Sequence, residues 1–133
     1  MSEYTSSRDG FQRAMQWSLS GKPEDAKLYA EATGTPDFCH IMNGQKLEGD
    51  SYVQGIAEWR AKSSEYHPVV EEFLRDGDQL AARVTGTIKA DGAHLFFGSF
   101  MFAKIDEASG KMMWLKERSV WGPVGKDPEH GVN

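Results

Sequence analysis

Two different spacings of apolar residues divide the chain into an N-terminal and a C-terminal half. In the N-terminal half the apolar residues recur at helical spacing, which predicts three helices. These helices cover residues 11–19, 23–33 and 51–64. Gly21 and Gly34 end the first two helices. Pro68 disfavours helical geometry at the residue before it, so the third helix should end around residues 64–66.

The C-terminal half has runs that are typical of β-strands, separated by short turns. The four predicted strands are residues 69–74, 79–89, 93–105 and 111–121. Asp91-Gly92 is a strong turn signal, because this dipeptide favours a two-residue hairpin. Four successive strands predict an antiparallel meander, and a short apolar run over residues 37–42 that turns at Asn43-Gly44 should add to it. Helices followed by strands predict an α+β domain.

The strand predicted over residues 93–105 is apolar on both of its faces. Phe96, Phe100 and Phe102 point to the side opposite Leu95 and Phe97, whereas a half-solvated strand should alternate apolar with polar residues. Helices can cover only one face of the sheet. Because large exposed apolar patches are rare, we expect a homodimer that packs sheet against sheet. The alternative is that the C-terminal tail covers these phenylalanines.

Length and composition are those of one ordinary globular domain. The chain has 133 residues, 39% hydrophobic and 26% charged, with a net charge of −5. We expect a single domain over residues 1–133, with its core at about 8–121 and a loose tail at 122–133. The basic residues form no run, and no apolar run is long enough to span a bilayer, so neither nucleic acid nor a membrane is an expected partner.

Other features of the composition favour a cytoplasmic protein without a cofactor. The N-terminus lacks an apolar signal core, and the single Cys39 fits a reducing compartment. The four histidines and Cys39 show no metal-ligand spacing, and no glycine-rich phosphate loop is present. The sequence therefore predicts neither a metal nor another cofactor.

The order and spacing of several short motifs resemble the nuclear transport factor 2-like superfamily, and within it the SnoaL-like and ketosteroid isomerase branch. The motifs are Ser18-Leu19-Ser20-Gly21-Lys22 at the end of the first helix, the strand over residues 38–42 followed by Gly49, and the hairpin Ala108-Ser109-Gly110-Lys111-Met112. The resemblance covers residues 11–121. It implies a cone-shaped curved antiparallel sheet wrapped around N-terminal helices, with a deep apolar pocket. Such proteins are usually dimeric, and they include isomerases, dehydratases, cyclases, epoxide hydrolases and domains that only bind or dimerise.

The resemblance gives His40 a specific place in this pocket. Counted back from Gly49, His40 falls where ketosteroid isomerases keep their general-base aspartate, and a histidine can also transfer protons near neutral pH. The two oxyanion donors of those isomerases would fall at Ala14 and near Met101, and neither side chain can donate a hydrogen bond. Because an oxyanion hole is often the largest catalytic contribution, steroid-type isomerisation is excluded.

Three polar residues are candidates to assist His40. Asp37 could orient the imidazole only if the strand is irregular, since alternation places the two on opposite faces. Glu117 or Arg118 must face inward; an inward Glu117 would have a raised pKa and act as an acid, and an inward Arg118 would bind an anionic group. Glu117 is favoured, because Met113, Leu115 and Trp121 share its parity. The residues expected to bind substrate are Trp17, Tyr29, Tyr52, Trp59, Met101, Arg118 and Trp121.

Two interpretations remain open from the sequence. The first is a cofactor-independent isomerase, dehydratase or cyclase that acts on a small, largely apolar metabolite bearing a carbonyl or hydroxyl group, as in secondary metabolism, with His40 as general acid or base. The second is a ligand-binding or dimerisation module of the same fold, in which His40 is a partly buried structural histidine. The missing donors at Ala14 and Met101 favour the second interpretation, and the titratable His40 favours the first.

Overall fold

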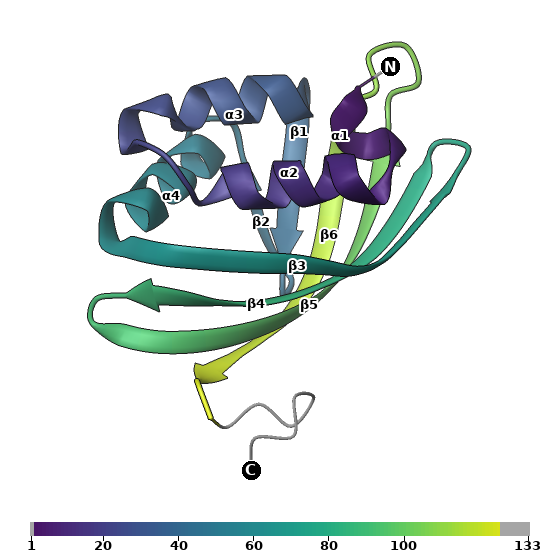
Figure 1. Ribbon diagram of the computed structural model, residues 1–133. Helices are drawn as coiled ribbons and strands as arrows, with labels where there is room; N and C mark the ends of the chain where they lie inside the picture. Colours follow the sequence, from purple (N-terminus) through teal and green to yellow (C-terminus); the bar gives the residue numbers. More distant parts are fainter. Residues whose placement is uncertain (1, 126–133) are drawn as a thin grey trace.

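The computed structural model describes residues 2–125 and contains a six-stranded sheet and a helical layer (Figure 1). The helices are α1 (Glu3–Ser6), α2 (Arg8–Ser18), the 3₁₀ helix η1 (Pro23–Asp25), α3 (Ala26–Thr33) and α4 (Gly49–Lys62). The strands are β1 (Gly34–Met42), β2 (Gln45–Glu48), β3 (Ser63–Asp76), β4 (Gln79–Ala90), β5 (Ala93–Ile105) and β6 (Met112–Pro123). No helix in the described part of the chain is both long and apolar enough to cross a membrane.

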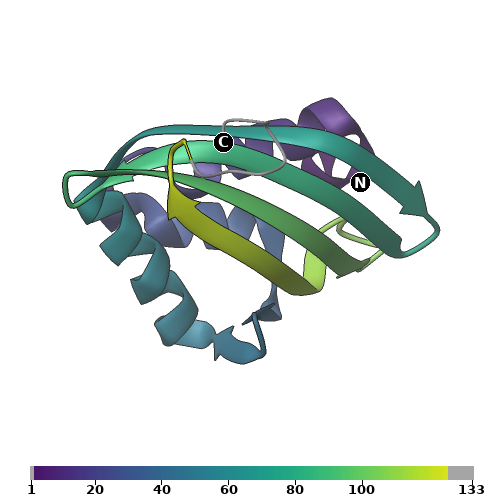
Figure 2. The same ribbon diagram turned by 90° about the horizontal axis from the view of Figure 1, so that it is seen from below.

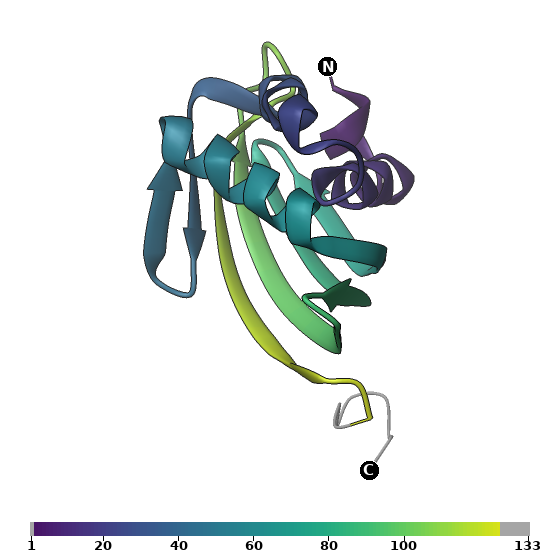
Figure 3. The same cartoon turned by 90° about the vertical axis from the view of Figure 1, so that its left-hand side faces the viewer.

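The sheet combines the predicted meander with the β1–β2 hairpin. Its strand order is β2-β1-β6-β5-β4-β3, and every neighbouring pair is antiparallel except β1 and β6, which run parallel. The sheet is strongly curved but not closed, and the helices lie on its concave side (Figures 2 and 3). The predicted α+β architecture, with a curved sheet around N-terminal helices, is confirmed.

Strand β3 starts earlier than the sequence predicts. Helix α4 ends at Lys62, so His67 and Pro68 lie inside a strand and not at a helix–strand junction. Proline is tolerated there because β3 is an edge strand with no further strand beyond it. Gln12 of α2 occupies this edge instead: its side-chain amide donates to the carbonyl of Pro68 and accepts from the backbone N–H of Val70, both at 2.7 Å.

Strand β6 is longer than predicted and contains an irregularity. It continues to Pro123, so the start of the expected loose tail is part of the sheet, and residues 126–133 lie outside the described residues. A register shift at the start of the β5–β6 ladder leaves Met113 exposed while Met112 is buried. The expectation that Met113 shares the inward parity of Glu117 is therefore wrong, although Leu115 is buried as expected.

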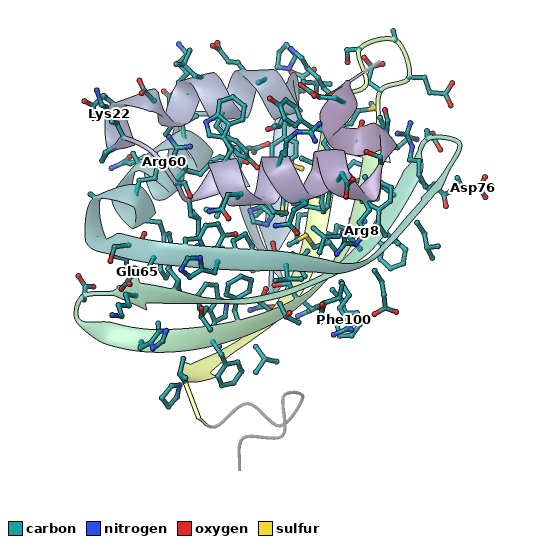
Figure 4. The ribbon with its side chains drawn as sticks, in the orientation of Figure 1. Arg8, Lys22, Arg60, Glu65, Asp76 and Phe100 are labelled. Atoms are coloured by element: carbon teal, nitrogen blue, oxygen red, sulfur yellow. The ribbon has the colours of Figure 1, made fainter. Side chains whose placement is uncertain are left out.

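Arg60 fixes the end of α2 to α4. Its buried guanidinium donates to the backbone carbonyls of Trp17 at 2.6 Å, Ser18 at 3.2 Å and Lys22 at 3.0 Å. Figure 4 shows Arg60 beside Lys22. The last carbonyls of a helix have no partner within the helix, so Arg60 supplies the missing donors. This contact holds α2 and α4 together where both helices line the cavity described below.

No helix of residues 2–125 lies over the convex face of the sheet (Figure 3). Phe100, Phe102 and Val120 are 60%, 62% and 66% exposed there, and Figure 4 shows Phe100 on the side of the sheet away from the helices. Phe96 has the same parity but is buried, because its partner Gly122 has no side chain and the Phe96 ring lies against it. The convex face thus carries an apolar patch, as the sequence predicts.

Candidate active site

A cavity of about 380 Å³ lies between the concave face of the sheet and the helices. Its walls come from α2, α3, α4, the β1–β2 hairpin, and the inner faces of β3, β4, β5 and β6. Most of its lining is aliphatic or aromatic, with a few polar side chains, which is the usual composition of a small-molecule site. The carboxylate of Glu117 and the imidazole of His40 are its chemically most reactive groups.

His40 and Glu117 meet across the parallel pair β1–β6. His40 is opposite Leu115 in the ladder and Met42 is opposite Glu117, so the two side chains lie diagonally on the inner face. The Nε2 atom of His40 is 2.9 Å from Oε1 of Glu117. Only 16% of the histidine side chain and 7% of the glutamate side chain are exposed. This is a buried, hydrogen-bonded imidazole–carboxylate pair that lines the cavity.

Two serine hydroxyls hold the other oxygen of Glu117. Ser119 Oγ donates to Glu117 Oε2 at 2.6 Å, and Ser99 Oγ is 2.6 Å from Ser119 Oγ. Ser99 and Ser119 are direct cross-strand partners on the inner face of β5 and β6, and Ser99 is fully buried. Both carboxylate oxygens of Glu117 are therefore fixed, and the group cannot rotate without breaking a hydrogen bond.

These contacts set the ionisation of Glu117. Burial by itself would raise the pKa of this carboxyl, but the hydrogen bond and charge of His40 and the hydroxyls of Ser119 and Ser99 outweigh burial and lower the pKa below its ordinary value. The expectation of a raised pKa is wrong, because the expected apolar surroundings are replaced by three polar partners. Glu117 is therefore an anion at neutral pH, not an acid.

The anionic Glu117 determines which nitrogen of His40 is free. A carboxylate only accepts hydrogen bonds, so Nε2 carries a proton and donates it to Glu117. In the neutral ring Nδ1 is then the basic nitrogen, and it has no hydrogen-bond partner among residues 2–125. No fully buried side-chain nitrogen or oxygen of these residues lacks a partner, so Nδ1 keeps accessible surface. This arrangement allows His40 to take up a proton while Glu117 stabilises the resulting cation.

The turn of the β1–β2 hairpin is attached to the same strand. Asn43 Oδ1 accepts from the backbone N–H of Ser119 at 2.8 Å, and Asn43 Nδ2 donates to the Ser119 carbonyl at 3.3 Å. The backbone N–H of Asn43 also donates to the Glu117 carbonyl at 2.9 Å. Asn43 adopts a φ of 49°, a left-handed conformation that asparagine tolerates better than most residues. The turn residue thus fixes the hairpin beside the His40–Glu117 pair.

Three buried tyrosines line the cavity near this pair. The ring of Tyr52 makes an edge contact with His40, with centroids 6.0 Å apart. Burial raises the pKa of Tyr29 to about 12 and likewise raises the pKa values of Tyr52 and Tyr66, so all three are neutral phenols. Tyr52 lies close enough to Tyr29, and Ser18 close enough to Tyr66, to affect the pKa of these two phenols.

Four aromatic rings follow one another along another part of the wall. Tyr66, Phe97, Trp121 and Trp59 form a series with centroid separations of 5.9, 5.0 and 5.4 Å and interplanar angles of 25°, 28° and 31°. All four line the cavity. The cavity therefore has a polar part around His40 and Glu117 and an extended aromatic part, which suits a largely apolar ligand with one reactive group.

Most of the residues predicted for the site lie in the cavity. His40, Glu117, Tyr29, Tyr52, Trp59, Met101 and Trp121 all line it. Ala14 is buried and does not line the cavity. Met101 lines it, but a thioether has no proton to donate, so neither residue supplies an oxyanion donor. The catalytic and binding roles of the lining residues stay predictions.

Three predicted residues lie outside the cavity. Asp37 is exposed near the start of β1 and does not contact His40, so Glu117 takes the orienting position instead. Arg118 is exposed on the convex face, because alternation in β6 turns it away when Glu117 points inward. Trp17 packs against Tyr29 and Tyr4 between the helices and belongs to the core.

Sequence reasoning missed Ser99, Ser119, Asn43 and Tyr66. For Ser119 a signal was available, because it shares the inward parity of Glu117 in β6. Ser99 has the inward parity of Phe97 and Met101, so a serine there was an unexplained polar residue on an apolar face. Within residues 2–125 no group of three or more metal-binding side chains is arranged around an ion site.

Comparison of sequences gives no relatives: no family model and no curated protein matches this chain. Comparison with solved structures finds proteins of similar structure. A pinacolase from Penicillium brevicompactum matches 88% of this chain and 82% of its own, with a TM-score of 0.71 and 8% identity. A SnoaL-like polyketide cyclase from Shewanella denitrificans matches 82% and 89%, with a TM-score of 0.65 and 10% identity.

A third similar structure is a hypothetical protein from Catenulispora acidiphila with a ketosteroid isomerase-like fold, solved in complex with trimethylamine. It matches 80% of this chain and 81% of its own, with a TM-score of 0.64 and 12% identity. This chain has the nuclear transport factor 2-like fold. Several proteins with this nuclear transport factor 2-like fold are enzymes on small molecules, and at these identities the likeness concerns the fold alone.

Proposed function

We propose that this protein is a cofactor-independent enzyme of the isomerase or lyase type that acts on a largely apolar metabolite bearing a carbonyl or hydroxyl group. The observation that carries the proposal is the His40–Glu117 pair, at 2.9 Å, in the wall of a mostly apolar cavity. A buried carboxylate costs free energy unless it is hydrogen-bonded, so an ionised Glu117 beside a small-molecule cavity suggests a role beyond packing.

In this proposal His40 is the general acid and base. Neutral His40 removes a proton from the substrate at Nδ1, and the imidazolium returns it to another atom of the substrate or to a leaving hydroxyl. Glu117 orients the ring through Nε2–H and stabilises the imidazolium, and Ser119 keeps Glu117 in place. The aromatic residues Trp59 and Trp121 contact the apolar part of the substrate.

The similar structures support this class of reaction. Proteins of the same fold are named as a pinacolase and as a polyketide cyclase, and neither name implies an external cofactor. The rival function is a ligand-binding module without catalysis. It is favoured by Ala14 and Met101, which leave two positions of the fold without the donors that a steroid-type isomerase needs.

Proton transfer can be tested before the substrate is known. The protein is incubated in D₂O with a panel of cyclic ketones and of tertiary alcohols, and hydrogen–deuterium exchange at carbon or loss of water is followed by NMR. We expect activity on at least one compound, lost in His40→Ala and kept in Asp37→Asn, which changes an exposed residue on the same strand. Equal activity of His40→Ala and wild type would reject the enzyme proposal; binding without turnover would favour the rival function.

We also propose that the convex face of the sheet joins two copies of the chain. Phe100, Phe102 and Val120 expose apolar surface that a second copy would cover. Exposed Lys116 and Arg118 lie on β6, whereas Glu72 on β3 is already paired with Arg83 of the same chain. Contact between two copies related by a two-fold axis would therefore rest on the apolar patch.

A further inference from the structure

The cavity has an unusual balance of charge. Its only carboxylate is Glu117, and no lysine or arginine lines it in the part of the chain that the structure describes. Arg60 is buried near Tyr29, but its guanidinium does not line the cavity and donates to the backbone carbonyls of Trp17, Ser18 and Lys22. When His40 is neutral, the lining of the cavity in the described part of the chain therefore carries one net negative charge.

We propose that this cavity selects organic groups that are positively charged or electron-deficient, such as a quaternary ammonium or a carbocation-like centre, over neutral and anionic groups of the same shape. For the reaction, this inference rests on the proposed function. It adds that the site stabilises positive charge on the reacting molecule. It makes a claim about binding that holds even if the protein is not an enzyme.

The groups around the cavity agree in this preference. Glu117 is fixed at both oxygens, so its negative charge cannot move away from the ligand. Six aromatic side chains line the same space, and aromatic rings attract cations through the negative potential of their faces. An enolate or carboxylate would be repelled by Glu117.

This preference fits a dehydration or rearrangement better than an enolisation. The imidazolium of His40 gives its proton to a substrate hydroxyl, and the C–O bond breaks with its electron pair leaving as water. The carbon that remains is electron-deficient, and Glu117 and the aromatic rings lower its free energy. Neutral His40 then removes a proton from the adjacent carbon, the C–H electron pair forms the double bond, and the imidazolium is restored. No oxidant, reductant or metal takes part in this sequence.

Matched ligands test the inference without knowledge of the substrate. Choline, its uncharged isostere 3,3-dimethylbutan-1-ol and the anion 3,3-dimethylbutanoate are titrated into the full-length protein at pH 8, and binding is followed by NMR shifts of the cavity methionines Met15, Met42 and Met101. We expect choline to bind at least about tenfold more tightly than the isostere, with the anion weakest. Equal or tighter binding of the isostere or the anion would overturn the inference.

Three variants separate the possible causes. Glu117→Gln should abolish the preference, and His40→Gln, which keeps the carboxylate, should retain it; the opposite pattern would refute the role of Glu117. If Glu117→Gln does not fold, Glu117→Met serves instead, because it has a similar length, carries no charge and should also abolish the preference. Preference for choline with neither deuterium exchange nor loss of water in the panel would reject only the enzyme proposal, whereas exchange or dehydration without the preference would reject only this inference.

Discussion

The two faces of strands β5 and β6 reverse the usual distribution of polar and apolar residues. On the concave face Ser99, Glu117 and Ser119 are polar and lie in or beside the core, whereas on the convex face Phe100 and Val120 are apolar and exposed. Buried polar groups cost free energy unless they are hydrogen-bonded, as these three are, and large apolar groups are seldom exposed together on a monomer. This contrast is what we expect if, as proposed above, the concave side binds a ligand and the convex side binds a second copy of the chain.

The largest effect should come from removing the charge on the concave face. Glu117→Gln keeps the shape of the side chain but no longer stabilises an imidazolium at His40, so we expect activity in the deuterium-exchange or dehydration assay to fall about 10²–10⁴-fold. Lys116→Gln is the matched control, because it changes the neighbouring exposed residue of the same strand. A similar loss in both variants would mean that the two faces do not differ in function.

The next largest effect concerns the convex face and assembly. Phe100→Glu places a charge in the apolar patch and should convert a dimer to a monomer in size-exclusion chromatography with light scattering at micromolar concentration. The thermal unfolding of the separated monomer should change little, because Phe100 is largely exposed and packs on little within the chain. Monomeric wild-type protein under these conditions would reject the dimer.

The acid side of the stability curve should report the ionisation of Glu117. Its pKa is lowered on folding, so its contribution to stability is fully present above the ordinary glutamate pKa and is lost as the pH falls through the lowered value. Urea denaturation of wild type between pH 7 and pH 3 should therefore show a loss of stability that is smaller in Glu117→Gln. Parallel curves for the two proteins would show that Glu117 is not stabilised as an anion.

The smallest effect compares two adjacent residues of β6. Ser119→Ala removes one hydrogen bond from Glu117 and should raise the carboxyl pKa measured by ¹³C NMR, with a stability loss of about 1–2 kcal/mol. Ser119→Thr, which keeps a hydroxyl, should bring the carboxyl pKa of Glu117 most of the way back to its wild-type value. Val120→Ala on the convex face should leave that pKa unchanged and alter the free energy of unfolding by less than about 0.5 kcal/mol. An unchanged pKa in Ser119→Ala would exclude the serine as a positioning residue.

Much of the fold follows from the sequence because its signals are local. The turn at Asp91-Gly92 and the run rich in apolar residues that follows predict β5 over residues 93–105, and the structure has the same bounds. The start of β3 could not be predicted, because a proline within a strand is acceptable only at an edge, and the edge position depends on the tertiary arrangement. The exposure of Met113 could not be predicted for a similar reason. The register shift is a property of the paired strands β5 and β6 and not of a single strand.

The candidate site was partly predictable. The place of His40 came from a resemblance in the order of elements, and the inward direction of Glu117 came from its parity with Leu115 and Trp121. The contact between His40 and Glu117 joins residues 77 positions apart through a parallel pairing, which no local pattern specifies. The lowered pKa of Glu117 depends on Ser99 and Ser119, and their polar contacts become visible only when the strands are paired.

The double role of Asn43 has a consequence for protein engineering. Its amide holds the hairpin that borders the cavity, and it does so on the backbone of Ser119, whose hydroxyl in turn holds Glu117. A designer who wants to enlarge the opening for a bulkier substrate cannot exchange this residue without also disturbing the charged pair. Gln45 and Leu47 line the same cavity from the hairpin, and among residues 2–125 no side-chain hydrogen bond involves either of them, so a library for altered ligand range should vary those two positions and leave the turn intact.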